Sequence, residues 1–335
     1  MEVRWISPEG VEKRGWSDVP SLLERDDGFV WVDVVSCDDE AAKALADRFG
    51  FHPLAVRDIL ERSRLPKIHA YPDHLFVDLH APNPGEAGHI DVVQLDQFIG
   101  RRYLVTTHGP AAAGVPVDPA IRETSQIAER LETGRTQVGT PFELSYLIVS
   151  SLANRQGDAL AQLATQAAGL EERVRGELGD PVHVLEEMFL IRHELLSIRT
   201  IAAESGEVFV RMSALTRMIP PEAPPLILDL INRFERVTRM SDSEKEFTQG
   251  VIDFYQARTS TRMNVSIVRL ALIVKRLTAV TVVLAGLGAV GGLFGMSQAT
   301  PALAGEEGFG FWAITLGAIV TAGLAVAFLR WIDWI

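Results

Sequence analysis

The stretch LTAVTVVLAGLGAVGGLFGMS, residues Leu277–Ser297, determines the architecture predicted for this chain. Its first twenty residues, Leu277–Met296, carry no charged side chain. A helix of about 20 apolar residues, rising about 1.5 Å per residue, spans the roughly 30 Å hydrocarbon core of a bilayer. We therefore predict a first transmembrane helix over residues 277–296.

A second apolar stretch, residues 309–332, is interrupted only by Arg330 and predicts a second transmembrane helix. The loop between the spans, residues 297–308, has no Lys or Arg and contains Glu306 and Glu307, whereas basic residues crowd the approach to the first span. Cytoplasmic flanks of membrane helices are enriched in Lys and Arg. We expect a multi-pass protein of the cytoplasmic membrane, with both termini in the cytoplasm and the loop outside.

The composition of the remaining chain is that of a soluble protein. The start of the sequence lacks the apolar region of a secretory signal, so we expect the N-terminal part to stay in the cytoplasm. The single cysteine, Cys37, cannot form an intramolecular disulfide and is expected to be a buried small side chain. The net charge of −12 argues against nucleic acid as a partner and is compatible with binding of cations.

Residues 1–118 are predicted to form a cytosolic α/β domain with a mostly antiparallel sheet. Runs rich in β-branched and aromatic residues predict strands, and two segments between them, residues 38–50 and 53–61, have helical spacing. Pro53 suits the first turn of the second helix. The predicted strands are VRWI (3–6), FVWVDVV (29–35), HLFVDLH (74–80), VVQLDQFIG (92–100) and RRYLVTTH (101–108).

Residues 119–276 are predicted to form a cytosolic helical domain and stalk. Helical periodicity is broken at Gly179–Pro181 and at Pro220–Pro225. No breaker follows before the membrane, so one helix is expected from about Leu226 to Met296, a length of about 100 Å. Such a helix needs neighbours, including copies of itself. The expected helices cover residues 119–133, 141–178, 182–218 and 225 onward.

Motifs for nucleotide binding are absent from the sequence, which contains no GxxxxGK[ST] loop and no GxGxxG after a strand. The sequence therefore gives almost no support to an enzyme. Because two spans per chain cannot enclose a path for a polar solute, transport would require several copies around an axis. With no ATP site, the membrane potential would supply the driving force.

A stripe of small, weakly polar and apolar residues recurs every three or four positions along the first span and the residues just before it. Such a stripe suits either the wall of a symmetric pore or plain helix packing, and the glycine pairs nearby suit close helix packing. The residues of the stripe are Val274, Leu277, Thr281, Ala285 and Gly288.

The chain resembles the CorA-type magnesium and divalent-cation channels, over nearly its whole length. At the C-terminal end the matching motif is Lys275-Arg276-Leu277-Thr278, leading without a gap to Gly295-Met296-Ser297. The N-terminal matches are FGFHPLAVRD (49–58), RLPK (64–67), Tyr71, HLF (74–76) and YLVTTH (103–108). The resemblance implies an α+β cytosolic domain, a long helical stalk and two C-terminal transmembrane helices, assembled as a funnel-shaped homopentamer in the lipid membrane.

The resemblance also implies roles for individual residues. Gly295, Met296 and Ser297 would form the selectivity site at the pore mouth. Leu277 would be the hydrophobic gate and Val274 a constriction beside it. The pore wall would be formed by Thr281, Ala285 and Gly288. Glu306 and Glu307 resemble the family's acidic external loop, although an exposed, solvated pair fits them equally well.

Three departures from the family pattern bear on function. Ser297 replaces an asparagine whose carboxamide would face the hydration shell of Mg²⁺, an ion that sheds water reluctantly. Gly286 replaces a proline. Asn264, the candidate for an inner polar ring, lies about one heptad farther from the mouth than in the family. An insertion of about seven residues preserves the helical face, so Asn264 stays a candidate for this ring.

Acidic side chains along the stalk are candidates for cytosolic regulatory Mg²⁺ sites between subunits, although a solvated helix face explains them as well. We expect passive transport of Mg²⁺, with Co²⁺, Ni²⁺ and Zn²⁺ as further candidate ions. A zinc-preferring relative and a non-conducting regulator or scaffold stay open as alternatives. The candidate acidic residues of the stalk are Asp229, Glu235, Asp242, Glu246 and Asp253, with Glu244 beside them.

Overall fold

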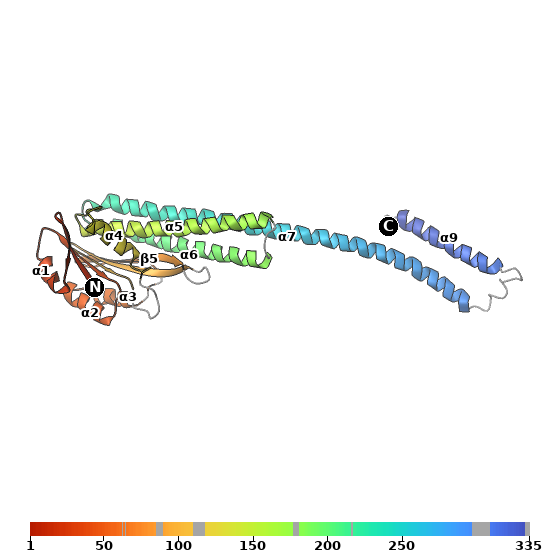
Figure 1. Ribbon diagram of the computed structural model, residues 1–335, viewed down its shortest axis with the longest axis horizontal. Coiled ribbons are helices and arrows are strands. Elements are labelled where there is room, and N and C mark those ends of the chain that lie inside the picture. The colour runs from red at the N-terminus through yellow and green to blue at the C-terminus, as the bar shows by residue number, and fades with distance from the viewer. Residues whose placement is uncertain are drawn as a thin grey trace. The chain divides into compact units, whose positions relative to one another are not determined.

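The computed structural model describes residues 1–61, 63, 65–84, 90–109, 118–176, 181–215, 217–296 and 309–331 (Figure 1). It divides into two compact units, Met1–Ile252 and Asp253–Ile335. The long helix α7 (Ala223–Met296) contributes residues to both units. An uninterrupted helix was predicted from about Leu226 to Met296, and that prediction is confirmed.

A seven-stranded sheet forms the centre of the first unit, in the order β2-β1-β3-β7-β6-β5-β4. Only the β3–β7 pair is parallel, so the prediction of a mostly antiparallel sheet is confirmed. Strands β2 and β4 were not predicted. The strands are β1 (Glu2–Ser7), β2 (Gly10–Arg14), β3 (Phe29–Val34), β4 (Lys67–Ala70), β5 (His74–Pro84), β6 (Ile90–Gly100) and β7 (Tyr103–Thr107).

One face of the sheet is covered by short helices. The Asp38 carboxylate accepts a hydrogen bond from the backbone N–H of Ala41 and caps α2, and Gly50 ends that helix with a φ of 69°. Phe51 follows and stacks on Phe98 of the sheet, with ring centroids 3.8 Å apart. The elements on this face are the 3-10 turn η1 (Trp16–Asp18), α1 (Val19–Leu23), α2 (Asp39–Phe49) and α3 (Pro53–Leu60).

The other face is covered by long helices, so the first unit has three layers (Figure 1). The first part of α7 joins this layer, where Phe234 stacks on Phe209 with ring centroids 5.7 Å apart. The predicted helices are confirmed to within a few residues, and of the break predicted at Gly179–Pro181 only Pro181, the first residue of α6, lies within the described residues. The other helices of this layer are α4 (Arg122–Glu132), α5 (Pro141–Gly176) and α6 (Pro181–Ser213).

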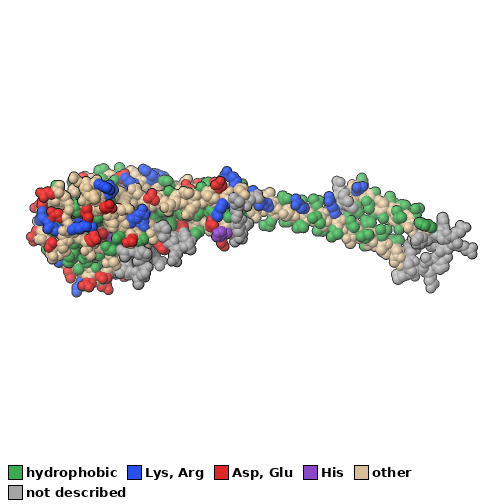
Figure 2. Space-filling view, viewed as in Figure 1, with side chains coloured by type: hydrophobic (Ala, Val, Ile, Leu, Met, Phe, Trp, Pro, Cys, Tyr) green, Lys and Arg blue, Asp and Glu red, His purple; other side chains and the backbone are tan. Residues whose placement is uncertain are grey.

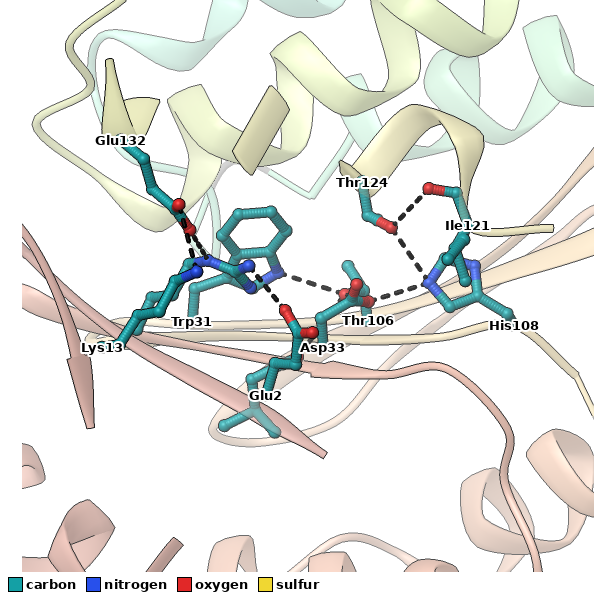
Figure 3. A network of polar contacts seen from close by, with 11 residues as sticks. Glu2, Lys13, Trp31, Asp33, Thr106, His108, Ile121, Thr124 and Glu132 are labelled. Carbon is teal, nitrogen blue, oxygen red and sulfur yellow. Dashed lines mark hydrogen bonds and ion pairs between the residues drawn. The ribbon is translucent and has the colours of Figure 1, made fainter. Parts of the chain in front are cut away.

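A buried polar network fastens α4 to the parallel strands (Figure 3). The Thr106 hydroxyl donates to Asp33 Oδ1 over 2.5 Å and accepts from Trp31 Nε1 over 3.1 Å. His108 Nε2 lies 2.8 Å from Asp33 Oδ1 and 3.2 Å from Thr124 Oγ1 on α4. The Asp33 carboxylate and the Thr124 hydroxyl both contact Nε2 of His108. The imidazole therefore cannot relay a proton between them through its two nitrogens, as it does in a hydrolytic triad.

Candidate functional site

One helix in the described part of the chain is long and apolar enough to cross a membrane. It covers Ala223–Gly292. Only 6% of its most apolar segment is buried, whereas the core helix of a soluble protein is mostly buried. The segment Thr315–Trp331 of α9 (Phe309–Trp331) is a shorter apolar helix. Figure 2 shows hydrophobic side chains gathered over α9 and the C-terminal part of α7. This second unit carries the residues predicted to line a pore.

One side of α7 is buried within the second unit. Ala279 has no exposed surface, and Lys275, Val283 and Leu287 are half-buried at spacings of four residues. A matching stripe on α9 is half-buried at spacings of three or four: Thr315, Ala318, Ala322, Ala325 and Leu329. Spacings of three and four residues select a single helix face. We infer that these two stripes pack against each other.

The α9 stripe was missed by the sequence analysis, although its signal was present. Small side chains let membrane helices approach closely, and three of the five positions are alanine. The apolarity of the whole helix hid this pattern.

The predicted pore stripe lies on the opposite side of α7. Leu277 is 65% exposed and Val274 58% exposed, and Thr281, Ala285 and Gly288 are exposed as well. At about 100° per residue, all five lie on the half of the helix that faces away from Ala279. The structure thus brings the five residues to one face that no other part of the described chain covers.

The polarity of this face is low even at its threonine. The hydroxyl of Thr281 donates a 2.8 Å hydrogen bond to the backbone carbonyl of Leu277, one turn earlier. Its proton is therefore used within the helix, and only the oxygen lone pairs are left for a passing hydrated ion.

The remaining pore candidates are placed only in part. Gly295 and Met296 are the last two residues of α7, and Ser297, Glu306 and Glu307 lie outside the described residues. Asn264 is exposed on α7, ten residues before Val274. Ten residues of a straight α-helix leave an offset of about 80° around the axis, so Asn264 does not continue the stripe directly.

Two of the stalk carboxylates are occupied by arginines of their own helix. Asp229 accepts from Arg233 Nε over 2.5 Å and from the Tyr146 hydroxyl over 2.9 Å, and the bond from Arg233 lowers the pKa of Asp229. Glu235 Oε2 lies 3.3 Å from Arg239 Nη1. Both ion pairs follow the i,i+4 spacing that neutralises charges along a helix surface.

The other stalk carboxylates are dispersed along α7. Asp242 accepts from Arg199 Nε on α6 over 2.6 Å, whereas Glu246 and Asp253 are exposed. No group of three or more His, Cys, Asp or Glu side chains that could hold a metal ion occurs among the described residues. A regulatory metal site on the stalk therefore stays a prediction that needs a second subunit.

The known proteins that this chain resembles are metal ion transporters. A family model described as "CorA-like Mg2+ transporter protein" matches residues 26–330. YfjQ of Bacillus subtilis, named as a candidate metal ion transporter, is 24% identical over 316 residues, which cover 93% of this chain and 92% of YfjQ. The cobalt/magnesium transport protein CorA of Thermotoga maritima is 21% identical over 345 residues, covering 100% of this chain and 92% of that protein.

A solved structure is similar over its full length. The complete structure of the CorA magnesium transporter from Methanocaldococcus jannaschii matches with a TM-score of 0.72 and 19% identity, covering 100% of this chain and 99% of that chain. This similarity supports the order of parts seen here, namely an N-terminal α/β domain, a long helix and a shorter C-terminal helix.

Proposed function

Because this chain belongs to the CorA-like Mg²⁺ transporter family, we propose that it forms a homopentameric channel that passes Mg²⁺ across the cytoplasmic membrane. The family is one of transporters, and a divalent metal ion is the class of cargo that membership supports. Mg²⁺ is the main proposed ion, with Co²⁺, Ni²⁺ and Zn²⁺ as further cargo.

The observation that carries the proposal is the exposed stripe on α7. One side of that helix is buried at Ala279, where we infer packing on α9, while the side with Leu277 and Thr281 stays uncovered in the single chain. Two membrane helices cannot enclose a polar path, so this face must meet other copies or lipid. In a ring of five subunits the stripe faces the axis and α9 lies outside it in contact with lipid.

The driving force in this proposal is the membrane potential. A divalent cation that moves inward across about 100 mV gains about 4.6 kcal/mol, which supports roughly a thousandfold accumulation. The sequence has no motif for ATP binding. Basic residues before the first span and none in the external loop support cytoplasmic termini, so the ion would enter past Glu306 and Glu307.

The proposed path has a polar mouth and an apolar gate. Gly295, Met296 and Ser297 would meet the hydrated ion, because Mg²⁺ gives up its water shell reluctantly and is best recognised through it. The path then continues along Gly288, Ala285 and Thr281. A ring of Leu277 side chains, with Val274 beside it, would close the path by excluding water.

A zinc-preferring channel is a second candidate, favoured by one observation. Ser297 stands where the family has asparagine, and its shorter side chain leaves a wider mouth with weaker contacts to a hydration shell. A non-conducting regulator is the alternative from a different class, and potential-driven uptake of divalent cations into proteoliposomes distinguishes it from a channel.

Cysteine scanning of α7 tests which face lines the path. The native Cys37 is buried and its pKa is raised to about 12, chiefly by that burial, so the wild-type background is unreactive toward thiol reagents. In proteoliposomes, a charged, membrane-impermeant thiol reagent should react with Thr281→Cys and block uptake of Mg²⁺. The matched control is Val282→Cys, on another exposed face. Equal effects at both positions would contradict the assignment of the pore face.

A further inference from the structure

Two buried carboxylates lie directly opposite each other in the sheet of the first unit. Asp78 on β5 and Asp96 on β6 are paired in the antiparallel ladder, and neither side chain has exposed surface. Side chains paired in this way have Cβ atoms about 4.5–5.5 Å apart and project from the same side of the sheet. This pair is unrelated to the pore and plays no part in the function proposed above.

The two carboxylates differ in their hydrogen bonds. Asp96 accepts from Gln94 Nε2 and from the Thr107 hydroxyl, each over 3.0 Å. Neither oxygen of Asp78 has a hydrogen-bond partner within the described residues. A buried carboxylate without a donor is strongly disfavoured as an anion. Asp78 is therefore the member of the pair with the greater need for a proton.

Lys67 on β4 is shared between two carboxylates. Its Nζ lies 3.0 Å from Asp58 Oδ2 on α3 and 4.0 Å from Asp78 Oδ2. The ammonium thus pairs with Asp58, and Asp78 is its more distant neighbour. Among the described residues, this one ammonium therefore serves both Asp58 and Asp78.

Among the other described groups around the pair, His108 acts as a second source of positive charge, whereas His80 and Cys37 do not. Burial lowers the pKa of His80 to about 4, so its ring is neutral at pH 7 although Nε2 lies 3.4 Å from Asp78 Oδ1. The Cys37 thiol is neutral, and the Ser63 hydroxyl, which donates to the Leu65 carbonyl, acts to lower the pKa of Asp78. His108 is bonded to Asp33, and its charge acts to lower the pKa of Asp96 against the larger effect of burial. Burial, followed by the repulsion between the two carboxylates, raises the pKa of Asp78, and burial raises that of Asp96.

We propose that Asp78 and Asp96 hold one proton between them at neutral pH, and that Lys67 transfers from Asp58 to Asp78 when this proton is lost to the solvent. The proton leaves as the second carboxylate charge forms. That charge attracts the ammonium, whose Nζ lies 4.0 Å from Asp78 Oδ2, and Asp58 on α3 is left without its partner. The pair thereby links alkaline pH to the attachment of α3 at the edge formed by β4.

Infrared difference spectroscopy on the full chain tests the shared proton. Between pH 7 and pH 10 the wild type should lose the C=O stretch of a protonated carboxyl. Asp78→Asn and Asp96→Asn should each abolish this change. Asp91→Asn, which alters an exposed carboxylate on the same strand as Asp96, is the control and should retain the change. Absence of the band at pH 7 in wild type, or its persistence in both pair variants, would overturn the proposal.

The transfer of Lys67 has its own readout. Hydrogen exchange of the α3 amides, compared between wild type and Asp78→Asn at the same pH, should be equal at pH 7 and faster in wild type at pH 10. Equal exchange at both pH values would overturn the transfer. If Mg²⁺ added at pH 7 removes the infrared band, the pair exchanges its proton for a metal ion, and the proposal that pH controls this site is wrong.

Discussion

Leu277 and Ala279 lie on opposite sides of the same helix, and the first is 65% exposed whereas the second has no exposed surface. Residues two positions apart in an α-helix are separated by about 200° around its axis. We infer that the buried side packs on the half-buried stripe of α9, and the exposed side carries the five residues predicted to line a pore. This division of α7 into a packed side and an open side is the structural basis of the proposed channel.

A polar substitution at the proposed gate should increase ion leak. Leu277→Ser replaces an apolar ring by a wettable one, so closed channels should pass Mg²⁺ severalfold faster than wild type. The measurement is uptake into proteoliposomes with Mg²⁺ present on both sides, and Val282→Ser is the matched control on a different face. An unchanged rate in Leu277→Ser would show that Leu277 does not close the path.

A larger side chain at the packed position should destabilise the second unit. Ala279→Leu inserts atoms where Ala279 has no exposed surface, and overpacking of this kind costs about 1–3 kcal/mol. Ala289→Leu makes the same change at an exposed position of α7 and should have little effect. Thermal unfolding in detergent checks the difference, and equal midpoints for both variants would contradict packing at Ala279.

Removal of the buried charge at Asp33 should destabilise the first unit. Burial opposes ionisation of this carboxyl, but the bonds from His108 and Thr106 outweigh it and lower the pKa below 3.8. Asp33→Asn should cost about 1–3 kcal/mol at pH 7. The exposed Asp47→Asn is the control.

The same pKa shift gives the pH dependence of that contribution. The folded state binds the proton of Asp33 less readily than the unfolded state does, so the stabilisation is present above pH 3.8 and is lost as the pH falls through the folded-state pKa. The difference in unfolding free energy between wild type and Asp33→Asn should therefore shrink in acid. A difference that stays constant from pH 7 to pH 3 would contradict the ionised state of Asp33.

Restoring the family's residue at the mouth should change selectivity. Ser297→Asn supplies a longer side chain with a carboxamide oxygen, which reaches the hydration shell of Mg²⁺ more closely. Uptake of Mg²⁺ relative to Zn²⁺, Co²⁺ and Ni²⁺ should rise, as measured in competition in proteoliposomes. If a conducting protein keeps its ion ratios after this change, Ser297 does not contribute to selection.

Much of this fold was predictable because its signals are local. Breakers at Gly179–Pro181 and Pro220–Pro225 separate the long helices, and the absence of any breaker afterwards predicts α7. β2 and β4 were missed because they are short and largely solvent-facing, with few buried side chains to produce an alternating pattern.

The polar clusters were not predictable from local pattern. Asp33 and His108 are brought together only by the parallel pairing of β3 with β7, and Asp78 meets Asp96 only through the register of β5 and β6. A shift of one residue would turn such side chains to the other face. The pore stripe was recognised in the sequence. The sequence did not show that the opposite face of the helix is packed, because only the structure shows that Ala279 is buried.

Potential-driven uptake of divalent cations into proteoliposomes tests the central claim most directly. The purified chain is reconstituted, an inside-negative potential is imposed, and entry of Mg²⁺, Zn²⁺, Co²⁺ and Ni²⁺ is compared with that into protein-free vesicles. The proposed channel predicts Mg²⁺ entry that increases with the potential and needs no ATP. If no ion enters through a folded oligomer verified in the same vesicles, the chain is not a channel and the regulatory alternative takes its place.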